Sequence, residues 1–278
     1  MSKVQKPRYK QHYKKNGNKK FNLDVNLKGF LCSCNNREKD CIREAYNILN
    51  KYADILWPEQ PQTSEKHPVD SKSDEIEDEL RKELDQLKNN KDKKRFQVVD
   101  SGAKNFLFIQ TTVDDPVKLA EHIMNDICEK KGQESKFLLR LIPIEVTCKA
   151  YVKDIEQSFG QLCEKYFSST PKTFSIVFNH RNNNSVSRDD VIKNIADMVS
   201  KMGEEKKLEH KVDLKNAEVS IVIEIIRGFA FLAVVPNFIK FKKYNLLAFS
   251  SQQSEESSSV NEGCPLGTNS TGEQFVDK

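Results

Sequence analysis

The stretch "KVDLKNAEVSIVIEIIRGFAFLAVVP", residues 211–236, decides how this chain folds. Within it, residues 219–226 alternate between a wholly apolar set and a mixed set that includes Glu224, which is typical of a β-strand with one fully apolar face. Residues 227–228 interrupt the apolar run, and residues 229–235 are apolar almost throughout. We therefore predict a hairpin that turns at residues 227–228, with its second strand near the middle of a sheet.

The composition of the 278-residue chain indicates folded domains with polar, unpacked segments beside them. Charged residues make up 31% and hydrophobic residues 37%, which allows two modest domains but not a chain that is packed throughout. Residues 1–20 hold eight lysines and arginines and no acid, whereas residues 251–278 are acidic and rich in serine. We expect a disordered basic arm over residues 1–26, a charged insertion with a lone helix over residues 58–94, and a disordered acidic tail over residues 250–278.

The chain lacks the sequence signals of membrane proteins and of secreted proteins. No apolar stretch is long enough to cross a bilayer, and the N-terminus has no apolar signal-peptide core. We expect a soluble protein, made in the cytosol, with reduced cysteines and no membrane partner. Cys32, Cys34 and Cys41 could hold a metal, but no histidine or fourth cysteine lies nearby, so we favour small buried core residues.

The first half of the chain predicts a ferredoxin-like domain. Its expected elements are a strand over residues 29–34, a helix over residues 38–57, strands over residues 95–101 and 105–110, a helix that starts at Asp115 and Pro116, and a strand over residues 137–144. This order of strand, helix, strand, strand, helix and strand is that of a four-stranded antiparallel sheet backed by two helices.

The second half predicts two further helices in the domain that the hairpin closes. Apolar residues at helical spacing indicate a helix that begins at Lys149, and another helix follows Ser187, a residue type that caps helix N-termini. Residues 173–178, between these helices, have the pattern of a strand. The predicted fold class is therefore α+β, with a first domain over residues 27–135 and a second over residues 136–249.

No combination of residues in the sequence predicts a catalytic site. The glycines form neither a G-x-G-x-x-G motif nor a phosphate-binding loop, and no histidines have the spacing of a metal site. We therefore predict no catalytic residue, no metal, no cofactor and no small-molecule substrate. We expect Glu224 to pair with a basic residue on a solvated sheet face; catalysis by Glu224 or by a cysteine is the alternative.

Basic side chains of the second domain are the candidates for ligand binding. Residues 136–245 hold eighteen lysines and arginines against thirteen acids, and several of the cations flank the ends of predicted strands. Such side chains bind phosphates, riboses and base edges. The candidate RNA-binding residues are Arg140, Lys149, Lys153, Lys172, His180, Arg181, Asn182, Arg188, Lys240, Lys242 and Lys243.

Several ordered blocks of the sequence resemble one family. They include "VDLKNAEVSIVIEI", "RFQVVDSGAKNFLFI", "LLRLIPIEVTCKAYVKD", "FSIVFNHRNNNSVSRDDVI" and "FKKYNLLAF", and the resemblance covers about residues 29–249. The first block resembles the C-terminal signature of THUMP domains, and the whole set resembles the eukaryotic THUMP-domain tRNA acetylation adaptors of the Tan type. The resemblance implies a ferredoxin-like domain followed by a THUMP domain, and it assigns to RNA the positions Arg140, Lys149, Arg181 and Asn182.

The resemblance also implies a non-catalytic role and two partners. A protein of this family binds serine and leucine tRNAs and presents them to a separate ATP-dependent RNA cytidine acetyltransferase, which forms N4-acetylcytidine in the D arm. The basic arm fits a nuclear localisation signal, so we expect a protein of the nucleolus or nucleoplasm, with the cytoplasm as a second location. Two alternatives stay open: a general RNA-binding or ribosome-assembly factor, and an enzyme with an unrecognised site.

Overall fold

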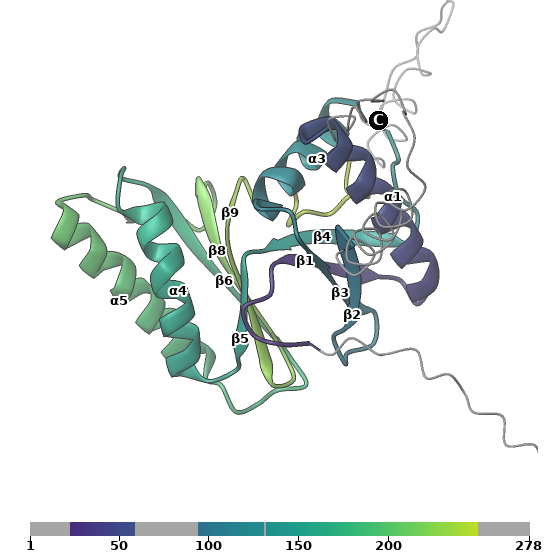
Figure 1. Ribbon diagram of the computed structural model, residues 1–278. Helices are drawn as coiled ribbons and strands as arrows, with labels where there is room; N and C mark the ends of the chain where they lie inside the picture. The colour runs from purple at the N-terminus through teal and green to yellow at the C-terminus, as the bar shows by residue number, and fades with distance from the viewer. Residues whose placement is uncertain (1–22, 59–93, 131, 250–278) are drawn as a thin grey trace, which may run out of the picture.

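The structure, a computed structural model, describes residues 23–58, 94–130 and 132–249 (Figure 1). Most of the expected basic arm, nearly all of the charged insertion with its expected helix, and the acidic tail lie outside these residues. Among the helices that are described, none combines the length and the apolar character that crossing a bilayer requires.

The first domain has the predicted ferredoxin-like arrangement. Its elements are β1 (Gly29–Cys34), α1 (Glu38–Leu56), β2 (Phe96–Asp100), β3 (Phe106–Thr111), α3 (Pro116–Lys130) and β4 (Leu138–Ile144). The four strands lie in the order β2-β3-β1-β4, and every pair is antiparallel. Asp115 caps α3 as predicted, because its carboxylate accepts a hydrogen bond from the Lys118 amide at 2.9 Å.

The second domain is a five-stranded mixed sheet built around the predicted hairpin. Its elements are β5 (Val146–Lys149), α4 (Val152–Phe167), β6 (Thr173–Arg181), α5 (Arg188–Lys206), β7 (Lys211–Val212), β8 (Val219–Ile226) and β9 (Phe229–Pro236). The strand order is β5-β9-β8-β6-β7, so both strands of the hairpin are interior. Arg227, in the turn of the hairpin, has a left-handed φ of 53°. Ser187 caps α5 as predicted and accepts a hydrogen bond from the Asp190 amide at 3.4 Å.

The chain passes from the first sheet to the second at Glu145, and here the structure differs from the prediction. β4 belongs to the first sheet, so the change of sheet falls later than the boundary expected at residues 135–136. The helix predicted from Lys149 is wrong at its start: residues 146–149 form β5, and α4 begins at Val152. Pairing with β9, a strand much later in the chain, holds this segment extended. The local spacing of apolar residues does not indicate that pairing.

The hairpin is buried on both faces, which its alternating pattern did not predict. One face packs under α4 and α5, and the other faces the first domain (Figure 1). On that second face the ring of Phe231 lies 5.3 Å from the ring of Phe108 in β3. The expectation of a solvated face around Glu224 is therefore wrong, because the first domain covers the strand and leaves Glu224 only 4% exposed.

After β9 the chain returns to the first domain and runs along the free edge of β4. The Leu141 amide donates a hydrogen bond to the Tyr244 carbonyl at 3.1 Å, and the Leu246 amide donates to the Leu139 carbonyl at 2.9 Å. Within residues 238–249, most of the aromatic rings are buried, whereas the lysines are exposed. This segment therefore ties the second domain to the first.

Candidate nucleic-acid interface

At one end of the second sheet, four paired residues on neighbouring strands form a row that places two of the predicted RNA-binding cations on one face. Arg181 of β6 lies opposite Ile226 of β8, which in turn lies opposite Phe229 of β9. Phe229 also lies opposite Lys149 of β5. Because opposite residues point to the same face of a sheet, this end row (Arg181, Ile226, Phe229 and Lys149) faces the first domain.

Aromatic rings hold both cations of the end row in place. The guanidinium carbon of Arg181 lies 4.0 Å from the centroid of the Phe106 ring, which belongs to β3 of the first domain. Lys149 Nζ lies 4.0 Å from the centroid of the Phe229 ring. A cation above a ring face is attracted to the ring and can still donate hydrogen bonds from its outer side. Both cations are exposed, so the end row presents two oriented positive charges to solvent.

A buried acid, Glu224, lies on the same face between cations of both domains. Its Oε1 accepts a hydrogen bond from Asn179 Nδ2 at 2.6 Å. Burial raises the pKa of Glu224 above its ordinary value, although the Asn179 bond and the nearby charges of Arg181, Arg140 and Lys243 act to lower it. Within the described parts of the chain none of these cations forms an ion pair with Glu224, so their donors stay available to a ligand.

Glu224→Gln is expected to make the folded protein more stable at neutral pH. Because the pKa of Glu224 is raised on folding, the folded state binds this proton more tightly than the unfolded state. The wild type therefore loses stability as pH rises from the ordinary glutamate pKa through the raised one, and a glutamine has no such loss. Urea unfolding at a series of pH values should give equal stabilities below that window and a more stable variant above it. A less stable variant at neutral pH would mean that attraction to the three cations outweighs the cost of burial.

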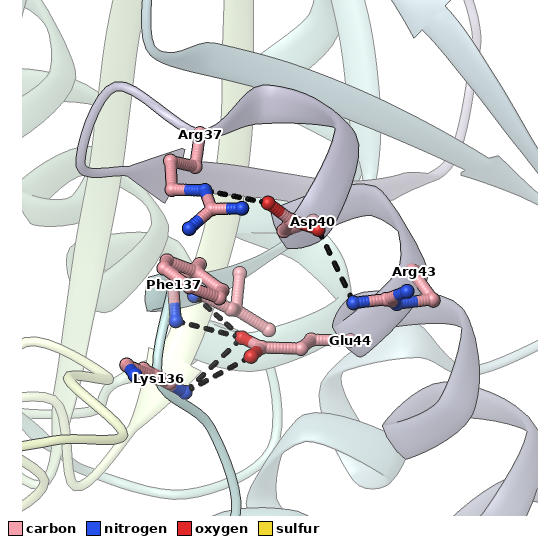
Figure 2. A network of polar contacts seen from close by, with 7 residues as sticks. Arg37, Asp40, Arg43, Glu44, Lys136 and Phe137 are labelled. Carbon is pink, nitrogen blue, oxygen red and sulfur yellow. Dashed lines mark hydrogen bonds and ion pairs between the residues drawn. The ribbon is translucent and has the colours of Figure 1, made fainter.

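Glu44 of α1 fixes the segment that leads into β4 and toward Arg140 (Figure 2). Its carboxylate accepts hydrogen bonds from the successive backbone amides of residues 136–138, at 2.8–3.2 Å. The guanidinium carbon of Arg37 lies 4.5 Å from the centroid of the Phe137 ring, on the same segment. Charge-assisted bonds of this kind are strong, so the start of the strand that carries Arg140 is held firmly on α1.

Four more of the predicted residues lie at the same end of the second sheet as the end row. Lys153 is in the first turn of α4, directly after β5, and Arg188 begins α5. His180 and Asn182 lie at the end of β6 and in the loop that follows. Asn183 ties this loop to the hairpin turn, since its carbonyl lies 2.6 Å from His180 Nδ1 and its side chain donates to the Arg227 carbonyl at 2.6 Å.

The remaining predicted residues do not join the end row. Lys172 precedes β6 and therefore lies at the opposite end of the sheet. Lys240 lies beside α3 of the first domain. Lys242 and Lys243 lie in a turn with left-handed φ values of 50° and 62°, and of these two it is Lys243 whose charge acts on Glu224.

Two residues of this surface were missed by the sequence prediction. Arg227 was interpreted only as a turn residue of the hairpin. Its guanidinium lies close to Gly102 of the first domain, because a Cβ built on Gly102 would lie 3.1–3.2 Å from guanidinium atoms of Arg227. Tyr151 precedes α4 and is 66% exposed. The available signal was the alternation of Lys149, Tyr151 and Lys153, which interleaves an aromatic side chain with two cations.

The cysteines that the structure describes are poor nucleophiles. Burial raises the pKa of Cys148 and that of Cys163 to about 11, and it also raises the pKa of the Cys32 thiol. These thiols stay protonated at neutral pH, whereas the thiolate is the reactive form. In the described ranges, no three potential metal ligands of the types His, Cys, Asp and Glu come together.

The family described as "THUMP domain" matches residues 149–235, which run from the end of β5 through β9 of the second domain. The chain is 37% identical to "THUMP domain-containing protein 1 homolog" of Drosophila melanogaster, over 86% of the chain and 79% of that relative. It is also 37% identical to "THUMP domain-containing protein 1" of Homo sapiens, over 81% of the chain and 64% of that protein. The chain belongs to the THUMP domain-containing protein 1 family.

A more distant relative is "tRNA acetyltransferase TAN1" of Saccharomyces cerevisiae, which is 25% identical over 81% of this chain and 85% of that protein. The chain thus spans most of the fly and yeast relatives but just under two thirds of the human one. The domain match and this relative support a role in RNA binding and tRNA modification.

Proposed function

We propose that this protein is a non-catalytic adaptor that binds tRNA and presents it to a separate RNA cytidine acetyltransferase. By the family resemblance, the products are serine and leucine tRNAs with N4-acetylcytidine in the D arm. The observation that carries the RNA-binding part is the end row, with Lys149 and Arg181 oriented on one face and Arg140 close by. The link to acetylation is supported by the yeast relative, which is named as a tRNA acetyltransferase.

The chemistry of the end row suits the phosphate backbone of RNA. Exposed Arg and Lys side chains neutralise phosphates and displace their counterions, which gives affinity that falls with salt. The two cations of the end row belong to separate strands, and Arg140 comes from the other domain. Because the first domain also supplies the Phe106 ring beneath Arg181, we propose that both domains shape the RNA-binding surface.

The name of the yeast relative raises the alternative that this chain itself transfers an acetyl group. Within the described part of the chain, the groups that the sequence offered for that task, Glu224 and the cysteines, are unsuited to it. Glu224 is enclosed between the domains and bonded to Asn179, and burial keeps the thiols of Cys148 and Cys163 protonated. These observations support an adaptor that leaves the chemistry to its partner.

Purified protein mixed with tRNA, ATP and acetyl-CoA is expected to form no N4-acetylcytidine by itself. Mass spectrometry of the digested tRNA is the measurement. Adding the cytidine acetyltransferase should produce the modified base, and the yield should fall when the protein is omitted. Acetylcytidine formed without a second polypeptide would contradict the adaptor proposal, and equal binding of tRNA and an unrelated hairpin would contradict its specificity for tRNA.

A further inference from the structure

The outer edge of β6 is open for most of its length. β7 pairs with β6 only at residues 173–174, and no other strand of the described chain lies on this side of β6. β6 itself continues to Arg181, so residues 175–181 form an edge that no neighbouring strand covers. An edge of this kind presents N–H and C=O groups with which another chain can pair as an added strand.

The hydrogen bonds at the two ends of β6 show which backbone groups point outward. The Phe174 carbonyl accepts a hydrogen bond from the Asp213 amide at 2.9 Å, on the side of β7. The Arg181 carbonyl accepts from the Arg227 amide at 2.9 Å, at the end of β8. Because the backbone groups of successive strand residues point to alternate sides, three residues direct their N–H and C=O groups to the open edge: Ile176, Phe178 and His180.

The outer edges of β2, β4 and β5, in contrast, are each covered within the described chain. The Val98 amide of β2 donates to the Tyr46 hydroxyl at 2.7 Å, the Thr147 carbonyl of β5 accepts from the Asn26 amide at 2.6 Å, and the segment after β9 bonds to β4. Open edges are usually guarded by charges, prolines or bulges. Residues 174–178 of β6 have no charge, no proline and an uninterrupted register with β8, so this edge is suited to pairing.

Apolar side chains line the open edge on the face that carries the helices. Val212 of β7 lies opposite Phe174, so it shares this face with Ile176, and it is 62% exposed. α5 lies over β6, and Asn194 on its inner side donates a hydrogen bond to α4 at 2.5 Å. Ile192, two residues earlier, is on the other side of the helix, toward the open edge, and is only partly buried. Val212, Ile176 and Ile192 therefore form an apolar strip beside the unpaired backbone.

We propose that the open edge of β6 receives an extended segment of the RNA cytidine acetyltransferase as an added strand. This inference rests on the proposed function and names the surface that the enzyme partner uses. The segment pairs its backbone with the outward groups of β6 and places apolar side chains, at alternate positions, on the apolar strip. RNA is excluded as the occupant because its backbone has no alternating N–H and C=O groups and the strip carries no charge for its phosphates.

The position of the edge favours the enzyme over a second copy of this chain. β6 ends at Arg181, a residue of the end row, so an added strand lies directly beside RNA held there. That is where an adaptor must bring its enzyme. A second copy that paired its own β6 in antiparallel fashion would instead place two first domains side by side on one face of the joined sheet, because the first domain covers that face in each copy.

Ile176→Pro in the full chain tests the proposal. The proline removes one outward N–H and places its ring in the path of the added strand, whereas the bonds between β6 and β8 stay intact. Biolayer interferometry with the immobilised cytidine acetyltransferase should show an affinity about tenfold weaker than that of the wild type. Ile176→Val, the matched control, keeps the N–H and the apolar side chain and should bind like the wild type. Both variants should keep the wild-type affinity for tRNA, so that only the yield of N4-acetylcytidine falls in the proline variant.

A second pair of variants guards against unfolding of the first. Val212→Ser shortens the apolar strip at an exposed position and should weaken enzyme binding about fivefold. Ile55→Ser, at a residue of α1 that is 58% exposed, removes a comparable side chain from the first domain and should have no effect. Both should melt near the wild-type temperature.

Enzyme binding that persists at wild-type strength in the folded Ile176→Pro and Val212→Ser variants would overturn the proposal. So would self-association of the wild type, measured by light scattering, that Ile176→Pro abolishes while enzyme binding is kept, because the edge would then belong to a second copy. A wild-type chain that neither binds the enzyme nor raises the yield of N4-acetylcytidine would instead overturn the proposed function, so the two failures are distinguishable.

Discussion

Phe231→Ala is expected to lower the free energy of unfolding by about 3–5 kcal/mol. The sequence did not predict so large an effect, because Phe231 lies opposite Glu224, on the face of the hairpin that the pattern of residues 219–226 marked as mixed. Phe231 is fully buried, and it lies on the face of β9 that the first domain covers, against the ring of Phe108. Its removal leaves a cavity at the contact between the two domains. Denaturant unfolding followed by circular dichroism would measure the loss.

A double-mutant cycle locates the origin of this effect. Phe108→Ala, in the first domain, should destabilise by a similar amount, and the double variant should lose less than the sum by about 0.5–1.5 kcal/mol, the usual coupling of an aromatic pair. Two results would show that the domains do not share this core. One is a loss of unfolding free energy for Phe231→Ala as small as that of a surface substitution, and the other is strict additivity of the two losses in the cycle.

The hairpin of the second sheet was predictable because its signals are local. The alternation over residues 219–226, the break at residues 227–228 and the following apolar run all act within a short window, and β8 and β9 form where they predict. The ferredoxin-like order of the first domain was predictable for the same reason. Caps such as Asp115 and Ser187 also depend only on nearby amides.

The burial of Glu224 was not predictable from the pattern, because an alternating strand does not reveal what covers its second face. The first domain, which is distant in sequence, and the segment after β9 supply that cover, and the pattern of the strand indicates neither of them. β5 was missed for a related reason, since only its pairing with β9 makes residues 146–149 a strand. With the helix start displaced, Tyr151 was assigned to the helix and its exposure went unnoticed.

The largest loss of tRNA affinity is expected for the double variant Lys149→Ala with Arg181→Ala. Each lost charge-assisted hydrogen bond costs roughly 1.5–3 kcal/mol, so two such losses weaken binding by about a hundredfold or more at low salt. The loss should shrink as salt rises, because part of it is counterion release. Arg181→Lys keeps the charge and should retain most of the salt dependence, which separates the charge from the contact with the Phe106 ring.

Lys172→Ala provides the matched control for this double variant. Lys172 is a cation of the same sheet, but it lies at the end away from the end row. Its removal should leave the affinity and the salt slope near the wild-type values. Thermal melts of all variants should confirm folding, since Lys149 is exposed and Arg181 lies at the domain contact.

The slope of log affinity against log salt for tRNA is the most direct test that the end row binds the phosphate backbone. It should be measured for the wild type, Lys149→Ala, Arg181→Ala, the double variant and Lys172→Ala. We expect each single loss in the end row to lower the slope by about 0.7–0.9, the double variant by about twice as much, and Lys172→Ala by nothing measurable. Wild-type slopes in the folded end-row variants would contradict the account and place the RNA elsewhere on the protein.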